Sequence, residues 1–154
     1  MDFSLSKEQE MMRKEMRHFC KKELNKEYVQ WMDEHVDFPP DDLWQKFVDI
    51  GFFKASIPEE YGGDSLGYLD QMIVYEEICK ASMSVALAVG TTSGFGSRFI
   101  AELGTKAQKE KYLPLIGEGK LKTCMALTEP AGGTDILGAI STFAEEKQDR
   151  WVIN

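Results

Sequence analysis

Residues 123–135 read TCMALTEPAGGTD, and this stretch decides how the chain is divided. Its first part, residues 123–128, has the length of a strand and carries no helical stripe of its own. Its second part is a turn, because Pro130 fixes one backbone dihedral and the glycines allow positive φ. The helical pattern that precedes Lys122 therefore ends here. We predict a helical bundle over residues 1–120 and the start of a β-domain over residues 121–154, a mainly α fold.

Two further strands are expected after this turn, at residues 141–144 and 150–153, with a charged turn over residues 145–149 between them. Trp151 and Ile153 fall in an edge strand, and an uncovered edge invites pairing with another segment. A sheet of three strands is marginal unless something covers it. We infer an incomplete, barrel-like β-domain, so that the chain is a fragment or its remaining strands come from elsewhere.

Helical patterns fill the first 120 residues. Capping boxes at Ser6 with Gln9, and at Thr105 with Gln108, predict two helix starts. Phe38-Pro39-Pro40 predicts an extended approach to the second helix, Gly51 its end, and residues 57–63, IPEEYGG, a sharp loop. Pro114 is expected to disturb the last helix, and Gly117 to end it. The predicted buried stripes are Met12, Met16, Phe19 and Leu24; Leu43, Trp44, Phe47 and Ile50; Leu69, Met72, Ile73, Tyr75 and Cys79, with Glu76 and Glu77 as polar interruptions; and Phe95, Phe99 and Leu103.

Residues 85–89, VALAV, are apolar at every position, which predicts a central helix enclosed on all sides. The small residues that follow, with glycines at 90, 94 and 96 around residues 91–93, cost helix stability and let another group approach the backbone closely. Two interpretations stay open at this point. The run allows tight packing between helices, or it forms the wall of a ligand site.

Composition narrows the function classes. The chain carries 26 acidic and 18 basic side chains, a formal net charge of −8, which argues against nucleic acid and anionic lipid as partners. No apolar run approaches the ~20 residues of a membrane span, and residues 1–3 do not open an export signal. Three widely spaced cysteines favour reduced thiols and a cytoplasmic location. His18 and His35 lack neighbouring ligands, so we expect no metal site.

The turn at residues 128–135 has two interpretations. It is an elaborate turn held by the hydroxyl and carboxylate of Thr134 and Asp135, or its backbone N–H groups, glycines and hydroxyls form a cradle for an anionic or carbonyl-rich ligand. These residues alone identify no ligand.

A resemblance adds to this reading. Leu127-Thr128-Glu129-Pro130 followed by Gly133-Thr134-Asp135 resembles the first signature of the acyl-CoA dehydrogenase family, with Gly132 where alanine is common. Further stretches match the family in the right order along the whole chain. They are Met1-Asp2-Phe3 with Glu8-Gln9, residues 57–63, Leu103-Gly104-Thr105 with Gln108-Lys109, Tyr112-Leu113-Pro114, and Gly117-Glu118-Gly119.

The resemblance implies oxidation of an acyl-CoA thioester to its 2-enoyl form, with FAD as hydride acceptor. By position in the motif, Met125, Leu127 and Thr128 would line the flavin ring, and Gly133 and Thr134 would lie near flavin and CoA phosphates. Leu87, Val89 and Thr91, with Thr134, would contact the acyl-CoA substrate. No catalytic residue is assigned, because the family's glutamate base lies downstream, beyond Asn154; Glu129 is not that base. The chain alone is therefore expected neither to hold FAD tightly nor to turn over acyl-CoA.

The family also implies an electron-transferring flavoprotein as electron acceptor and a homo-oligomer, commonly a homotetramer, at full length. A mitochondrial matrix location would require removal of a transit peptide. Two alternatives remain: a flavoenzyme of the same family that reduces enoyl-CoA, and a non-catalytic helical interaction module that keeps the fold. Acyl chain length and branching are not indicated by these residues.

Overall fold

The computed structural model describes residues 4–35 and 39–154. Our expectations for residues 1–3 and for Phe38 lie outside these residues. The chain divides into two compact units, one that ends at Cys124 and one that begins at Met125, and each is described by itself.

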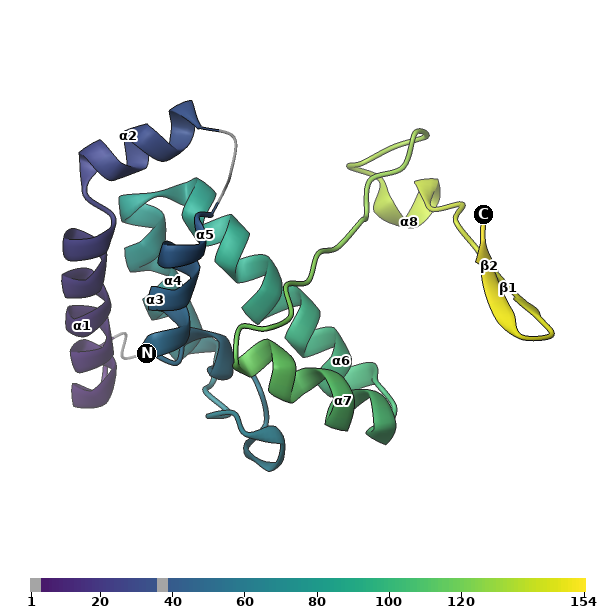
Figure 1. Cartoon of the computed structure of the whole chain (residues 1–154), viewed down its shortest axis with the longest axis horizontal. Coiled ribbons are helices and arrows are strands. Elements are labelled where there is room, and N and C mark those ends of the chain that lie inside the picture. Colours follow the sequence, from purple (N-terminus) through teal and green to yellow (C-terminus); the bar gives the residue numbers. More distant parts are fainter. Residues whose placement is uncertain (1–3, 36–38) are drawn as a thin grey trace. The chain divides into compact units, whose positions relative to one another are not determined.

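The first unit is helical, and the second carries a short helix and two strands (Figure 1). This confirms the mainly α fold class. The elements of the first unit are α1 (Lys7–Glu23), α2 (Lys26–Glu34), α3 (Asp41–Asp49), the 3₁₀ turns η1 (Phe52–Lys54) and η2 (Glu59–Tyr61), α4 (Tyr68–Ala81), α5 (Met83–Gly90), the π-helical segment η3 (Thr91–Gly96), α6 (Ser97–Leu103) and α7 (Lys106–Gly117). Those of the second are α8 (Ile136–Ala139), β1 (Ala144–Lys147) and β2 (Arg150–Ile153).

Both predicted capping boxes are confirmed. The Gln9 N–H donates to Ser6 Oγ at 3.2 Å, and the Ser6 N–H donates to Gln9 Oε1 at 3.0 Å. Thr105 and Gln108 repeat this exchange at the start of α7. Helix α2, which the predicted helices do not include, begins after Asn25, whose side chain accepts the Tyr28 N–H at 2.9 Å. An asparagine cap of this kind was the available signal.

The main core is built from the apolar faces of α1 to α5. Leu43, Trp44 and Phe47 of α3 are buried as predicted, and Phe52 and Phe53 of η1 extend the core. Ile50, predicted to complete the stripe, is 46% exposed because α3 ends there and Gly51 turns the chain with φ +74°. The helix end therefore removes the last residue of the stripe from the core.

Helices α1 and α4 pack against each other, and the contact includes a buried carboxylate. Ile73 of α4 is in the core, but Leu69 and Met72 are more than half exposed. Glu77, expected to be a polar interruption of this helix, is 3% exposed and is paired with Arg17 of α1. The sequence pattern was wrong here because the partner of Glu77 is 60 residues away in the chain.

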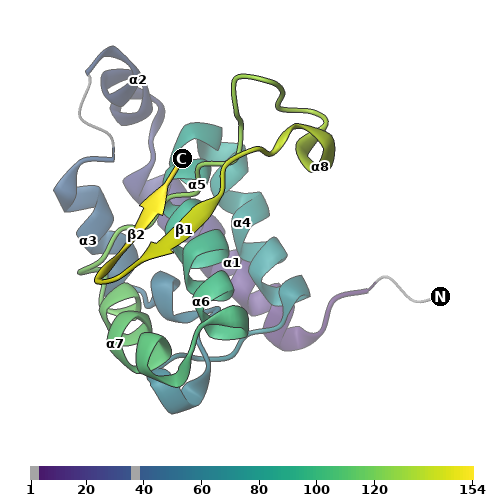
Figure 2. The ribbon, with the colours of Figure 1, turned by 90° about the vertical axis from the view of Figure 1, so that its right-hand side faces the viewer.

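A smaller core lies under α7. Ile57, Leu113 and Ile116 are fully buried in it. The predicted loop at residues 57–63 makes this packing possible, because Gly62 takes φ +83° and a Cβ on Gly63 would lie 2.0 Å from the Ile57 carbonyl oxygen. Helix α7 continues through Pro114 to Gly117. In Figure 2 it lies beside α6, the helix that it follows.

The second unit differs from the prediction in its strands. Residues 123–128 form no strand with any described residue, so the expected three-stranded sheet is a two-stranded one. β1 begins at Ala144, three residues later than predicted, and pairs antiparallel with β2 from Ala144 opposite Ile153 to Lys147 opposite Arg150. The expected five-residue turn is reduced to residues 148 and 149. The charged side chains of residues 145–147 are exposed to solvent and do not prevent these residues from pairing with β2, and two-residue hairpin loops are favoured.

Candidate functional site

Helices α5 and α6 are joined by η3 into one uninterrupted helix from Met83 to Leu103 (Figure 1). Val85, Ala86 and Val89 face the core, but Leu87 is 62% exposed. The prediction that residues 85–89 are enclosed on all sides was therefore wrong, because one face of this helix is not covered within the unit. Phe95, Phe99 and Leu103, predicted as a buried stripe, are also exposed, at 49%, 51% and 79%.

The π-helical segment is held by buried and half-buried hydroxyl groups. The Ser93 carbonyl accepts hydrogen bonds from the hydroxyls of Ser56 and Ser97, and these two hydroxyls are 2.8 Å apart. The Tyr75 hydroxyl is hydrogen-bonded to Ser93 Oγ, and burial raises the pKa of Tyr75. A π-helical turn leaves carbonyl groups without their usual α-helical donors, and such segments are frequent at functional sites. Here side-chain hydroxyls supply the donors.

An open groove of about 350 Å³ runs between α4 and the long helix. Met72 and Tyr75 of α4 line one side, and Leu87, Thr91 and Phe95 line the other. The groove is therefore mostly apolar, and it has the size of a small-molecule site.

The glycines of the long helix serve different purposes. A Cβ on Gly90 would lie 2.8 Å from the Tyr75 ring, and one on Gly96 would lie 1.8 Å from Thr123 Oγ1. At both positions the backbone packs closely against another residue, as in the first of the two interpretations of this run of small residues, tight packing between helices. Gly94 lines the groove, and its Cβ would meet only the Tyr75 hydroxyl, at 3.6 Å.

Two of the three substrate residues predicted in this unit, Leu87 and Thr91, line the groove. The third, Val89, is fully buried among the core side chains of α5. The helical spacing explains the division, because residues 87 and 91 are four apart and share a face, whereas residue 89 points away from it. The substrate roles of these residues stay predictions.

The motif lies in the second unit as an extended segment followed by a tight turn. Met125 and Leu127 are 38% and 37% exposed, and within the described residues the backbone N–H groups from Cys124 to Thr128 form no hydrogen bond. Glu129 and Gly132 exchange two backbone hydrogen bonds, which close the turn. A Cβ on Gly133 would come within 3.2 Å of Thr128 Cγ2, so glycine lets the two ends of the turn approach.

Glu129 is the centre of the hydrogen bonds in this unit. Its carboxylate accepts the Ser141 N–H and the Ser141 hydroxyl, both at 2.7 Å, and the Thr142 N–H at 3.0 Å. These hydrogen bonds lower the pKa of Glu129 to about 2, and those from Ser141 have the largest effect. The sequence pattern does not indicate this clamp, because the partners of Glu129 are 12 and 13 residues away in the chain. A carboxylate bound in this way is a poor proton acceptor at neutral pH, which supports its exclusion as the base.

The hydroxyls of Thr128 and Thr134 are exposed and have no partner within the described residues. Asp135 caps α8 by accepting the Gly138 N–H at 3.0 Å. Exposed hydroxyls, unpaired backbone N–H groups and apolar side chains in one segment fit a ligand with phosphates and a carbonyl-bearing ring, such as FAD. The same free backbone groups would also accept a further strand.

The described part of the chain also contains histidines, acidic side chains and thiols outside the motif and the groove. It holds no cluster of three or more possible metal ligands among His, Cys, Asp and Glu. Within residues 4–35 and 39–154, none of the helices combines the length and the apolar character that crossing a bilayer demands. The three cysteines are free thiols, and burial raises the pKa of Cys20 to about 11.

Residues 6–120 match the family model described as acyl-CoA dehydrogenase, N-terminal domain. The chain belongs to the acyl-CoA dehydrogenase family. This confirms the resemblance carried by the motif at residues 127–135 and the matching stretches before it.

Relatives and solved structures of the acyl-CoA dehydrogenase family match almost the whole chain. Glutaryl-CoA dehydrogenase of Desulfococcus multivorans is 36% identical over all of the chain and 40% of its own length. A subunit of the caffeyl-CoA reductase–Etf complex of Acetobacterium woodii is 34% identical over 97% of the chain and 39% of its own length. An acyl-CoA dehydrogenase from Bacillus anthracis, solved in complex with FAD, is 31% identical with a TM-score of 0.85 over 98% of the chain and 26% of its own. The chain spans about 40% of the length of the first curated relatives.

Proposed function

We propose that this chain contributes the amino-terminal helical domain and the first part of the central β-domain to an FAD-dependent acyl-CoA dehydrogenase, which oxidises an acyl-CoA thioester to the 2-enoyl-CoA. The family match over residues 6–120 carries this proposal. The signature at residues 127–135, which follows directly in the chain, supports it.

In this proposal the second unit binds the cofactor. Met125, Leu127 and Thr128 lie against the flavin ring, and the Thr128 hydroxyl donates a hydrogen bond to it. Gly133 and Thr134 bind phosphates through a backbone N–H and a hydroxyl. FAD, when bound, supplies the hydride acceptor for the β-hydrogen. Both hydroxyls are exposed and have no hydrogen-bond partner among the described residues, which is consistent with these roles.

The groove of the first unit is the candidate site for the acyl chain. In this proposal Leu87 and Thr91, which line the groove, contact the acyl chain directly, and Val89 supports the groove from the core. Thr134 belongs to the other unit and is proposed as a contact of CoA. An apolar groove suits an acyl group, because burial of each CH₂ contributes about 0.8 kcal/mol.

No acidic side chain of this chain is proposed as the base that removes the α-proton. The motif has two acidic side chains, Glu129 and Asp135, and the carboxylates of both accept hydrogen bonds from backbone N–H groups. The chain alone is therefore expected to be inactive. The electron acceptor is proposed to be an electron-transferring flavoprotein, and the full-length enzyme a cytoplasmic homotetramer. The relative from the caffeyl-CoA reductase–Etf complex supports the first of these.

That same relative gives a reason to keep a second candidate, a flavoenzyme that reduces an enoyl-CoA. The direction depends on the redox partners and on the potential of the bound flavin. A third candidate is a helical interaction module that keeps the fold and binds no flavin.

The test uses the longest natural protein that contains this chain. Visible flavin absorbance in the purified protein, bleached by an acyl-CoA under anaerobic conditions, is the expected result. Bleaching by reductant and recovery with an enoyl-CoA alone would favour the reductase. A folded, colourless protein that gains no absorbance when FAD is added would contradict the proposal and favour the module. Thr128→Val is expected to weaken FAD binding, whereas Glu145→Gln on the exposed hairpin, whose side chain is ion-paired with Lys147, is the control.

A further inference from the structure

The groove between α4 and the long helix is not uniform along its length. One end lies near Cys79 and Met83, where the two helices join, and it is apolar. The other end lies at Tyr68 and Arg98 and carries the only cation among the lining residues. A groove with a cation at one end is suited to an occupant that is apolar along its length and anionic at one end.

Arg98 is held in place by its neighbours. Its guanidinium carbon lies 3.7 Å from the centroid of the Tyr68 ring, and Nη2 donates to Gln71 Oε1 at 3.2 Å. Gln71 is 5% exposed, and its own Nε2 donates to the Leu66 carbonyl at 2.6 Å, which fixes the direction of the amide. A stacked, hydrogen-bonded guanidinium has lost part of its rotational freedom before any ligand arrives.

The charge of Arg98 is only partly balanced. Glu102 Oε1 is 3.7 Å from Nη1, which is longer than a hydrogen bond, and this side chain is 59% exposed. The Tyr68 hydroxyl also donates to Glu102, at 3.3 Å. A guanidinium has five N–H donors, and only one is used in a hydrogen bond to the described residues. The remaining donors form a fork that matches a carboxylate.

We propose that Arg98 is a specificity residue of the groove, and that the groove takes acyl thioesters whose chain ends in a carboxylate. This deepens the proposed function and rests on it for the thioester, but the binding itself needs neither FAD nor turnover. The terminal carboxylate binds Arg98, the methylene groups lie along Phe95, Leu87 and Met72, and Tyr75 forms the floor against Gly90.

The probes are two thioesters of N-acetylcysteamine, S-adipoyl and S-hexanoyl. They have six carbons each and differ by the terminal carboxylate, and neither carries the phosphates of CoA. Binding to the ¹⁵N-labelled 154-residue chain is followed by NMR through the backbone amides of the groove and the Arg98 Nε–H. We expect the adipoyl probe to bind about tenfold more tightly than the hexanoyl probe, because a charge-assisted hydrogen bond contributes a binding free energy of that order. Shifts of the Arg98 Nε–H should accompany only the adipoyl probe.

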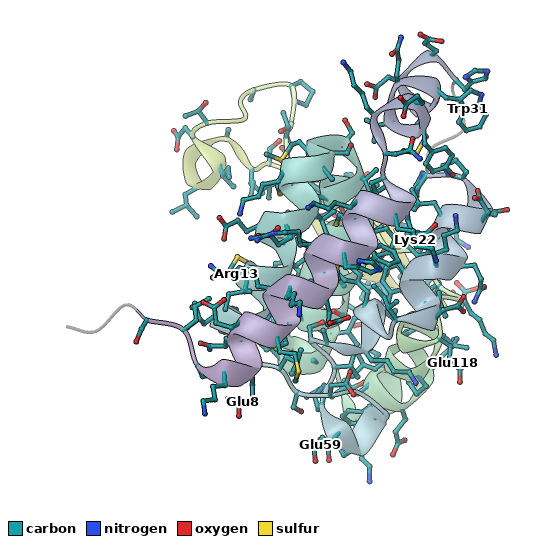
Figure 3. The ribbon with its side chains drawn as sticks, turned by 90° about the vertical axis from the view of Figure 1, so that its left-hand side faces the viewer. Glu8, Arg13, Lys22, Trp31, Glu59 and Glu118 are labelled. Carbon is teal, nitrogen blue, oxygen red and sulfur yellow. The ribbon has the colours of Figure 1, made fainter. Side chains whose placement is uncertain are left out.

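Variants separate the carboxylate contact from general loss of binding. Arg98→Gln should remove the tenfold preference and leave the hexanoyl affinity unchanged, and Arg98→Lys should keep part of it. Glu102→Gln removes the competing carboxylate and should increase the preference. The control is Arg13→Gln on the outward face of α1 (Figure 3), which also removes an arginine with a glutamate partner one turn away and should change neither affinity. Near-ultraviolet circular dichroism checks that each variant is folded.

Several outcomes would overturn the inference. Equal binding of the two probes, no binding of either, or an equal loss of both affinities in Arg98→Gln would each do so. Free CoA that shifts the Arg98 Nε–H while the adipoyl probe does not would assign the arginine to a phosphate instead. If the flavin test succeeds and these measurements fail, the proposed function stands without this specificity; the reverse result would leave a carboxylate-selective groove in a chain that is not part of a flavoenzyme.

Discussion

The guanidinium of Arg17 donates two hydrogen bonds, 2.8 and 2.9 Å long, to the two carboxylate oxygens of Glu77 and so joins α1 to α4. Lys80 Nζ donates a third to the same carboxylate, at 2.9 Å. Because the Glu77 side chain is almost fully buried, loss of its charge leaves the donors of Arg17 and Lys80 facing a weaker partner.

Glu77→Gln is therefore expected to lower the free energy of unfolding by about 3 kcal/mol, the lower end of the range for a broken buried pair, since Arg17 is half exposed. Chemical denaturation at pH 7 measures this. Glu76→Gln is the matched control, because Glu76 also binds Lys80 but is 58% exposed. A change below about 0.5 kcal/mol is expected there. Equal effects of the two variants would show that burial of Glu77 does not matter.

The same carboxylate predicts how stability depends on pH. The hydrogen bonds from Arg17, the largest influence, lower the pKa of Glu77 from 4.5 to about 2 in the folded protein. A lowered pKa stabilises the fold above the unfolded-state pKa, and this contribution is lost as pH falls from about 5 towards 2. Denaturation midpoints of the natural chain should fall over this range more steeply than those of Glu77→Gln. Parallel curves for the two proteins would contradict the assignment.

Gly96 and Gly94 differ in the space that they leave for a side chain. A Cβ on Gly96 would meet Thr123 at 1.8 Å from Oγ1 and 2.4 Å from Cβ, so rotation of the threonine does not relieve the clash. Gly96→Ala should destabilise the first unit by about 2 kcal/mol. Gly94→Ala should leave stability unchanged or raise it by up to about 1 kcal/mol, because alanine favours helices. Thermal unfolding of both variants tests the pair, and a similar loss of stability in both would show that the contact with Thr123 is not its cause.

Glu129 is expected to organise the second unit. In Glu129→Gln the amide group replaces one acceptor oxygen with a donor. The N–H groups of Ser141 and Thr142 should therefore exchange with solvent faster. The expected increase is about tenfold, which is the effect of weakening one charge-assisted hydrogen bond. Hydrogen exchange followed by NMR measures this. Glu145→Gln, which removes the charge that pairs with Lys147, is the control. In the natural chain the Ser141 amide shift should titrate near pH 2 and not near 4.5.

The parts of the fold that local chemistry determines could be predicted from the sequence. Ser6 with Gln9 and Thr105 with Gln108 are three residues apart, and Gly51 needs only its own backbone to end α3. The environment of Glu77 could not be predicted in this way, because it depends on Arg17 in another helix.

The candidate site shows the same division. The motif identified the turn at residues 128–135, yet the partners of the Glu129 clamp lie outside it. On the long helix, the pattern at residues 85–89 indicated apolar surroundings but not which face is covered. Leu87 lines the groove and Val89 the core because the packing of α4 decides the orientation.

The hydroxyls around Ser93 have a consequence for how the long helix opens. Most helices fray first at their ends, but this one has its least regular hydrogen bonding halfway along, at η3. Deuterium should enter there early if the Ser56 hydroxyl is removed, while the flanking turns stay protected. Because Thr91, Gly94 and Phe95 of η3 line the groove, a long helix that opens first at this segment would open at the wall of the groove.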